Sequence, residues 1–528
     1  MSSIYPSIFN DVIGPVMRGP SSSHAAGGAR IGELIRQAAG GGLRSVEVFF
    51  DPEGALAESH DGHGTDMGFA LGILGRSLTE EGAENWQQLI ADSGIDLKYT
   101  VRSYGAEHPG NYRIHAVSKT GKVIDADAVS TGGGMVELTR LNGYRVSVRG
   151  DYDEIVLLTF QDNTDSEIVS IVLSAVPDAE EISADRDDVK TCIDIKIGRP
   201  ADQSEATLLC ELFATNDVVT FSPFLPSRSH ANIKVPFRTV SEMLEYNRDR
   251  DLKLWQLAVI YESAFAGWDR HLVWDEMEDL VDVMERSVRT GLDGTDYEDR
   301  ILPRQSHLIE LNKDRLVPGD VFNTAIRYIT AIMETKSSMG VFVAAPTAGS
   351  AGCLAGTVLA VQDALGLPPE QAVKGLFAAG LIGVFFAGQA TFSAEVGGCQ
   401  AECGAGSAMA AAAVTEMMGG SAEECIDAAS FALQGLTGLA CDPVANRVEV
   451  PCLNKNIAGG MNALSSANVI LAGYDKVIPL DEAIGAVMEI GRLLPLELRC
   501  TCGGLGKTQA SEALRTKLDN KSDNLADQ

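Results

Sequence analysis

Apolar and polar positions in the first 150 residues alternate in short runs, and these runs predict a mixture of strands and helices. Residues 45–50 and 113–117 predict strands, and residues 65–78 predict a helix. Between 154 and 236 the pattern predicts strand, helix, strand, helix and strand, at 154–160, 166–175, 192–197, 205–214 and 218–221. From about 253 to 515 the pattern is helical. We therefore expect α+β N-terminal domains followed by a mostly all-α domain.

Composition divides the chain further. The predicted boundaries are a first domain at 1–153, a second at 154–236, a charged linker at 237–252 and an all-α domain at 253–528. The element order at 154–236 resembles the βαββαβ arrangement of an ACT domain, a small ligand-binding module. Because the sequence QDNTD (161–165) replaces the Gly-containing turn typical of that module, a purely structural role stays open.

Charge and hydropathy exclude several classes of partner. The 528 residues carry a net charge of −31, which argues against nucleic acid and anionic membranes as partners. Two uncharged stretches, 339–361 and 375–394, are long enough to span a bilayer. Their scattered Gly, Pro and hydroxyl residues predict buried central helices instead. Residues 1–13 lack the basic and apolar regions of a signal peptide, so we expect a cytoplasmic protein.

Cysteine placement points to metal binding. Eight of the ten cysteines lie beyond residue 350, a clustering that disulfide bonding does not need. Three cysteines lie next to or near Gly or Pro: Cys399 (GCQ), Cys441 (CDPV) and Cys452 (VPC). A cysteine held on a stiff turn is a good metal ligand, because it has little conformational freedom left to lose. Three such cysteines are typical of an iron–sulfur cluster with one iron open to substrate. Spacing alone leaves ordinary buried cysteines as the alternative, and this is the reading that we favour for Cys403.

Four polar turns are candidates for binding and proton transfer. GPSSSH (19–24) could bind a carboxylate or cap a helix, and HPGN (108–111) is a second polar turn. SHDGHGTD (59–66) offers His60 and His63 as acid and base, or, with Asp61, as zinc ligands of non-standard spacing. APTAGSAG (345–352) could form an anion-binding nest or simply interrupt a helix.

In this order, the motifs GPSSSH, GHGTD, HPGN, APTAGSAG, GCQ and CDPV…VPC resemble those of the iron–sulfur-dependent L-serine dehydratases, or L-serine ammonia-lyases. The resemblance covers nearly the whole chain. It implies a β-chain-like region, an ACT-like segment and an α-chain-like region fused in one polypeptide. Individually the short motifs are weak, whereas the three cysteines within matching flanks are specific.

The resemblance implies a chemistry and a set of residues. A 4Fe-4S cluster on Cys399, Cys441 and Cys452 would take the hydroxyl of L-serine on its open iron. Loss of water and hydrolysis then yield pyruvate and ammonia, as in serine catabolism that feeds gluconeogenesis. The implied catalytic base is His63. The implied substrate-binding residues are Ser21, Ser23, His24, Asn111, Thr347 and Gly349.

Some features of this chain leave the substrate and the cluster open to other interpretations. Arg447, between two predicted ligands, would bind a second acidic group if it pointed inward, so we add it to the substrate-binding candidates. Some family members end in a cysteine tail that can reach the open iron. This sequence ends NLADQ, so Cys500 or Cys502 would have to substitute, or both are structural.

The alternatives belong to other functional classes. One is a lyase for threonine, cysteine or a hydroxy-dicarboxylate, and another is a non-catalytic iron–sulfur sensor of amino acids. A pyridoxal-phosphate dehydratase is the third, but Lys336 and Lys455 lie in no convincing motif for it. We expect a small amino-acid substrate and a homodimer, because dimers are the commonest soluble oligomers.

Overall fold

The chain divides into two compact units. The computed structural model describes residues 5–230, 233–297, 299–501 and 503–526, with the backbone alone for 519–526. The sheet unit comprises His24–Asp61 and Thr65–Lys234, and the helical unit comprises Ile4–Ser23, Gly62–Gly64 and Val235–Gln528. Two segments from the N-terminal motifs, 19–23 and 62–64, therefore fold with the part of the chain that carries the three candidate cysteine ligands.

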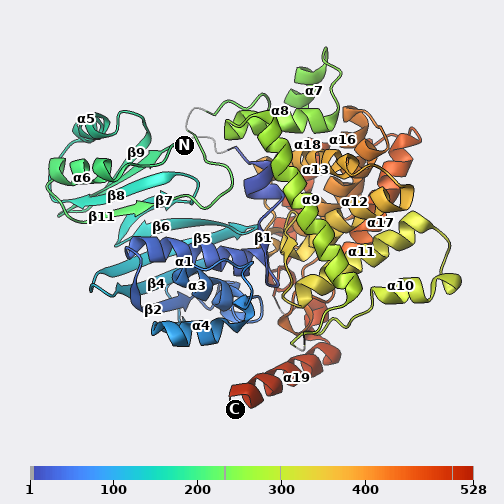
Figure 1. Cartoon of the computed structure of the whole chain (residues 1–528), viewed down its shortest axis with the longest axis horizontal. Helices are drawn as coiled ribbons and strands as arrows, with labels where there is room; N and C mark the ends of the chain where they lie inside the picture. The colour runs from blue at the N-terminus through green and yellow to red at the C-terminus, as the bar shows by residue number, and fades with distance from the viewer. Residues whose placement is uncertain (1–4, 231–232, 298, 502, 527–528) are drawn as a thin grey trace. The chain divides into compact units, whose positions relative to one another are not determined.

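In the described part of the sheet unit, six strands form a sheet in the order β3-β2-β4-β5-β6-β7 (Figure 1). The β2–β3 pair is parallel and the other pairs are antiparallel. Helices α1 and α3 bury apolar side chains such as Ile31 and Phe69 against Val48 and Ile114 of the sheet. The bounds are β2 Leu43–Phe50, β3 Asp96–Val101, β4 Asn111–Ser118, β5 Val123–Gly132, β6 Met135–Leu141, β7 Tyr144–Val148, α1 Gly27–Ala38, α2 Leu56–Ser59, α3 Thr65–Leu74 and α4 Trp86–Ser93.

Helices α1 and α3 approach each other closely because small residues lie between them. A Cβ atom at Gly32 would lie 2.5 Å from the carbonyl oxygen of Phe69, and one at Gly72 would lie 2.1 Å from that of Ala29. Both distances are too short for any side chain. Helix α3 ends at Leu74, four residues before the predicted end, and Gly75 follows in a left-handed conformation with φ +69°.

A second, four-stranded antiparallel sheet follows in the described part of the sheet unit, in the order β11-β8-β10-β9. Its elements run strand, helix, strand, strand, helix, strand along the chain. The hydrophobic pattern did not single out β9, whose positions are all partly or fully exposed. The bounds are β8 Asp153–Thr159, α5 Asp165–Ala175, β9 Ala179–Arg186, β10 Thr191–Ile197, α6 Gln203–Leu212 and β11 Val218–Phe221.

The helical unit is built around small-residue helices. Every position of α15 is buried, and most of α12 and α13 is too. Figure 1 shows α12 and α13 among the other helices of this unit. The bounds are β1 Val16–Met17, α7 Val240–Asn247, α8 Leu254–Ala266, α9 Arg270–Asp293, α10 His307–Leu311, α11 Asp320–Ser337, β12 Phe342–Val343, α12 Ala351–Leu365, α13 Glu370–Gln389, α14 Ala394–Gly397, α15 Ala405–Met417, α16 Ala422–Gly435, α17 Cys452–Leu471, α18 Leu480–Leu493 and α19 Gln509–Ala526.

Two segments of the helical unit, Ala348–Leu365 and Glu370–Gln389, are long and apolar enough to cross a membrane. They are 83% and 78% buried inside the protein, as core helices of a folded domain are. The stretch 237–252, predicted as a linker, contains the helix α7. Thr239 caps this helix by accepting a hydrogen bond from the backbone N–H of Glu242 at 3.2 Å.

Candidate active site

Two predicted cysteine ligands and one carboxylate converge in the helical unit. Ligand atoms of Cys399, Glu402 and Cys441 lie within 4.8 Å of one another, the one such group of three found among the described residues. Cys399 precedes the π-helical turn η6 (Gln400–Gly404), which carries Glu402. Both thiols are buried. The structure thus brings two of the three predicted ligands together with an acid that the sequence pattern did not single out.

Gln400 fixes the turns that carry these two cysteines. Its backbone N–H donates to the carbonyl of Leu439 at 3.0 Å, and its side-chain oxygen accepts from the N–H of Gly438 at 2.8 Å. Its amide nitrogen donates to the carbonyls of Gly397 and Val487, each at 3.0 Å. Because the side chain is fully buried, these bonds replace water, and losing one would leave a buried polar group without a partner.

Cys452, the third predicted ligand, begins helix α17 and lies outside the 4.8 Å group. Burial raises the pKa of its thiol to about 12. Metal binding needs a thiolate, so loading a metal here releases a proton. The buried amide of Asn456 donates to the carbonyl of Cys452 at 2.8 Å and to that of Gly349 at 2.7 Å. Asn456 therefore joins this cysteine to the APTAGSAG turn.

The APTAGSAG turn lies directly against Glu402. The hydroxyl of Thr347 donates to Glu402 Oε1 at 2.8 Å, and a Cβ atom at Gly349 would lie 3.0 Å from the same oxygen. The Cys399 thiol lies 3.9 Å from Glu402 Oε2. Desolvation, with a smaller contribution from Glu395, raises the pKa of Glu402 to about 7. A hydroxyl, a thiol and a carboxyl group thus meet in one buried place.

A lysine supports the Cys399 thiol from another direction. Lys455 on α17 lies with its Nζ 3.7 Å from Cys399 Sγ, and it donates to the carbonyl of Ala440 and to Asp442 Oδ1, each at 2.6 Å. Burial opposes its charge, but Cys399 and Asp442 outweigh that cost and raise the pKa of Lys455. A cation held beside a thiol favours the thiolate, which is the form that binds metal.

Cys500, which is partly buried, lies beside these thiols. It packs beside Cys399 and Cys441, and its backbone N–H donates to the carbonyl of Cys441 at 3.0 Å. Its backbone is left-handed, with φ +62°, an unusual conformation for a residue other than glycine. Cys502 lies outside the described residues.

Arg447 has an anionic partner within the protein. Its guanidinium donates to Asp299 Oδ1 at 2.9 Å, and the Asp299 side chain is about half exposed. Asp299 therefore pairs with the guanidinium of Arg447, which the sequence suggested as a binding group for a second acidic group of the substrate.

The N-terminal segments of the helical unit meet the same loops. Ser22 Oγ accepts a hydrogen bond from the backbone N–H of Ala348 at 3.2 Å, which places Ser21 and Ser23 on either side of this anchor. His63 is fully buried. At its neighbour Gly62, a Cβ atom would lie 2.8 Å from the carbonyl oxygen of Asn446, in the loop between Cys441 and Cys452.

The histidines of the sheet unit have internal partners. His24 Nε2 lies 2.8 Å from Ser59 Oγ, and burial lowers the pKa of His24 to about 3, so its imidazole is neutral near pH 7. His60 Nδ1 lies 2.8 Å from Asp66 Oδ1. Burial disfavours the charged form of His60, but the bond to Asp66 prevails and raises its pKa. This bond occupies one of the two ring nitrogens that a zinc site would draw on.

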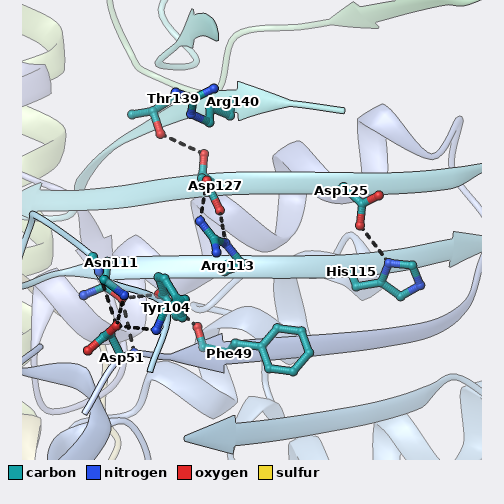
Figure 2. Close-up of polar contacts among 12 residues, drawn as sticks. Phe49, Asp51, Tyr104, Asn111, Arg113, His115, Asp125, Asp127, Thr139 and Arg140 are labelled. Carbon is teal, nitrogen blue, oxygen red and sulfur yellow. Dashed lines mark hydrogen bonds and ion pairs between the residues drawn. The ribbon is translucent and has the colours of Figure 1, made fainter. Parts of the chain in front are cut away.

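Asn111 lies in a network of polar contacts at the end of β4 (Figure 2). Its side-chain oxygen accepts from the hydroxyl of Tyr104 and from the N–H of Asp51 at 3.4 Å. Its amide nitrogen donates to the carbonyl of His108 at 2.7 Å. Asn111 thus holds the HPGN turn closed within the sheet unit.

A hollow of about 300 Å³ lies over β2, β4 and β5 of the same sheet. Two ion pairs lie in its lining: Arg113 binds both oxygens of Asp127 at 2.7 and 3.1 Å, and His115 lies 2.8 Å from Asp125 (Figure 2). This pairing is typical of a solvated sheet face, and it leaves the thiol group of the helical unit as the candidate for catalysis.

Comparisons with known proteins relate this chain to L-serine dehydratases. Residues 215–505 match the family described as serine dehydratase alpha chain. A probable L-serine dehydratase alpha chain of Bacillus subtilis is 35% identical over 285 residues, which are 53% of this chain and 95% of that protein. A probable beta chain from the same organism is 36% identical over 154 residues, or 29% of this chain and 68% of that protein. The L-serine dehydratase of Mycobacterium bovis is 26% identical over 502 residues, or 89% of this chain and 92% of that protein.

Proposed function

The chain belongs to the serine dehydratase alpha chain family, and on this premise we propose that it is an L-serine ammonia-lyase. It converts L-serine into pyruvate and ammonia. The observation that carries the proposal is the buried convergence of Cys399, Cys441 and Glu402 beside Thr347. The relatives named L-serine dehydratase support the same substrate.

We propose a 4Fe-4S cluster as the cofactor, held by Cys399, Cys441 and Cys452. The donors fit this group: three buried thiols come from three separate turns, and Lys455 lies beside one of them. When bound, a cluster with three protein ligands supplies a Lewis acid that makes the serine hydroxyl a better leaving group.

The residues around the thiols bind the substrate and move its proton. His63 is the base that takes the α-proton at a ring nitrogen, and its buried position keeps bulk water away from that proton. Ser21 and Ser23, beside the anchored Ser22, bind the substrate carboxylate. Loss of the α-proton and the hydroxyl gives aminoacrylate, which tautomerises and hydrolyses to pyruvate and ammonia.

Thr347 and Gly349 complete the proposed substrate pocket of the helical unit. The Thr347 hydroxyl orients the Glu402 carboxyl group, and the missing side chain at Gly349 leaves room for it. His24 and Asn111 of the sheet unit, and Arg447, stay proposals that rest on the resemblance. These three residues contact Ser59, His108 and Asp299, respectively, within the protein. Binding a substrate would require each of them to break or share that hydrogen bond.

The test is anaerobic formation of pyruvate from L-serine by protein reconstituted with iron and sulfide. The variant Cys441→Ala is compared with Cys425→Ala, a buried cysteine on α16 that serves as the matched control. The proposal expects pyruvate from the wild type and the control, and none from Cys441→Ala. If the iron-loaded wild type leaves L-serine unchanged but converts threonine or cysteine, that amino acid is the substrate instead of L-serine. Bound iron without turnover of any of these would favour a sensor.

We further propose that 154–236 forms an ACT-like module, that the protein is a homodimer and that it acts in the cytoplasm. The strand order β11-β8-β10-β9 and its two helices support the module. The nine described cysteines are all free thiols, which suits a reducing compartment. Light scattering of the purified chain tests the dimer, and calorimetry with L-serine tests ligand binding by the module.

A further inference from the structure

Lys336 places its amine in the core of the helical unit. It lies in the last turn of α11, and its side chain is among the largest that are fully buried. In the described part of the chain, none of the recorded ion pairs includes this lysine, so its ammonium is held by neutral groups. A charge in such a place is costly unless hydrogen bonds satisfy it. The partners it has found therefore indicate what it does.

Both recorded partners of the Lys336 ammonium are backbone carbonyls, and each belongs to a motif of the proposed active site. One bond goes to the carbonyl of Val448, in the loop between Cys441 and Cys452. The other, at 3.4 Å, goes to the carbonyl of Pro20. Pro20 belongs to the GPSSSH turn (19–24), called the serine-rich turn below, and directly precedes its three serines. One buried cation thus joins two loops that are more than 400 residues apart in the sequence.

Other contacts hold the far sides of the same two loops. Glu449, next to Val448, accepts hydrogen bonds from the backbone N–H groups of Ile301 and Leu302 at 3.0 and 2.7 Å. Ser22, two residues after Pro20, accepts from Ala348. Between these anchors, Lys336 links one loop directly to the other.

Burial lowers the pKa of Lys336, and acidic groups nearby oppose that effect. The acidic groups that act on it most are Cys452, followed by Glu449, Glu402 and Cys403, and two of these belong to the site described above. Attraction by these groups partly offsets the burial that lowers the pKa of Lys336.

We propose that Lys336 is a positioning residue for the dehydration of L-serine, which makes this inference depend on the proposed function. Its ammonium holds the serine-rich turn and the loop leading into Cys452 at a fixed separation. The groups proposed to bind the substrate carboxylate and the metal-binding thiol then keep one geometry through each turnover. The role is one of position, because Lys336 reaches the site through the two carbonyls.

The test measures backbone hydrogen exchange and steady-state kinetics of the full chain. The variant Lys336→Met removes every donor, whereas Lys336→Gln keeps an amide N–H that can still donate to a carbonyl. Lys253→Met is the matched control, because Lys253 Nζ also donates to two carbonyls of the helical unit, those of Gly419 and Gly420, at 2.8 and 2.9 Å. The exchange readout needs neither iron nor substrate.

We expect amides in both 18–24 and 442–452 to exchange at least about ten-fold faster in Lys336→Met, with partial recovery in Lys336→Gln and wild-type rates in Lys253→Met. The KM for L-serine should rise about ten-fold, with a smaller change in kcat. Wild-type exchange in either segment, or faster exchange with an unchanged KM, would overturn the proposal. If Lys336→Met fails to fold, Lys336→Gln should still show faster exchange in both segments and a raised KM, each by a smaller factor, and wild-type values of either would overturn the proposal. Absence of turnover in the wild type would refute the proposed function, whereas exchange alone would still decide whether Lys336 joins the two loops.

Discussion

The hydroxyl of Thr347 donates a hydrogen bond to Glu402 at 2.8 Å, and this bond connects the APTAGSAG turn to the turn that carries Cys399. Neither motif implies the other in the sequence, since 55 residues separate the two. Their contact gives the polar turn a partner and gives the cysteine turn a carboxylate.

Replacing Thr347 by Val keeps the shape of the side chain and removes the donor to Glu402. We expect the free energy of unfolding to fall by about 1–3 kcal/mol, because a buried carboxyl group loses a partner. We expect kcat/KM for L-serine to fall by about ten-fold or more. Thr330→Val is the control, since Thr330 donates only to the carbonyl of Ile326 within its own helix, at 2.7 Å. Equal kinetics for the two variants would remove Thr347 from the site.

Adding a methyl group at Gly349 forces Glu402 to move. The new Cβ atom would lie 3.0 and 3.1 Å from the two carboxylate oxygens, closer than ordinary contact allows. We expect Gly349→Ala to lose most of its activity. Gly485→Ala on α18 meets nothing within 4 Å, so it should stay active and gain about 0.5–1 kcal/mol of helix stability. Pyruvate formation and thermal unfolding of the two variants provide the comparison. An active Gly349→Ala would show that Glu402 tolerates displacement.

Lys455 is expected to help the protein retain a metal. Replacing it by Met removes the cation 3.7 Å from Cys399 Sγ and leaves Asp442 without its ion pair. We expect iron affinity to fall by about ten-fold or more, as measured by transfer of iron to a chelator under anaerobic conditions. Lys476→Met breaks a similar ion pair with Asp427 elsewhere in the helical unit, and it should retain iron like the wild type. If both variants lose iron at the same rate, the effect of Lys455 is not specific to the site.

His24 makes stability depend on pH. Its pKa is about 3 in the folded protein and about 6.5 in the unfolded chain, so unfolding takes up a proton below pH 6.5. The stabilisation is present above pH 6.5 and is lost as the pH falls towards 3. It amounts to about 2 kcal/mol between pH 7 and pH 5. Urea unfolding of His24→Gln should depend less on pH over this range. An unchanged slope for His24→Gln would show that His24 is not buried as a neutral group.

The sequence predicted the fold class because periodic apolar patterns are strong in both halves of the chain. It singled out Cys399 and Cys441 as candidate metal ligands because Gly and Asp-Pro mark their turns, and the structure brings these two thiols together. It did not predict β9, whose residues are too exposed to give a hydrophobic pattern, or α7, whose charged positions were interpreted as a linker.

The sequence patterns did not predict which buried polar residues hold the site together. Glu402, Gln400 and Asn456 are polar residues within stretches rich in Ala and Gly, and their partners lie on other elements. Such pairings depend on tertiary contacts that no local pattern encodes. The one signal available was the presence of single polar residues in otherwise apolar helices, where burial requires a hydrogen-bond partner.

The most direct test of the account relates bound iron to turnover in the wild-type protein. Samples reconstituted anaerobically to different extents are assayed for iron per chain and for pyruvate formed from L-serine. We expect a rate of pyruvate formation that is close to zero without iron and that rises in proportion to the bound cluster. Pyruvate formation by iron-free protein at the rate of the fully loaded protein would contradict it.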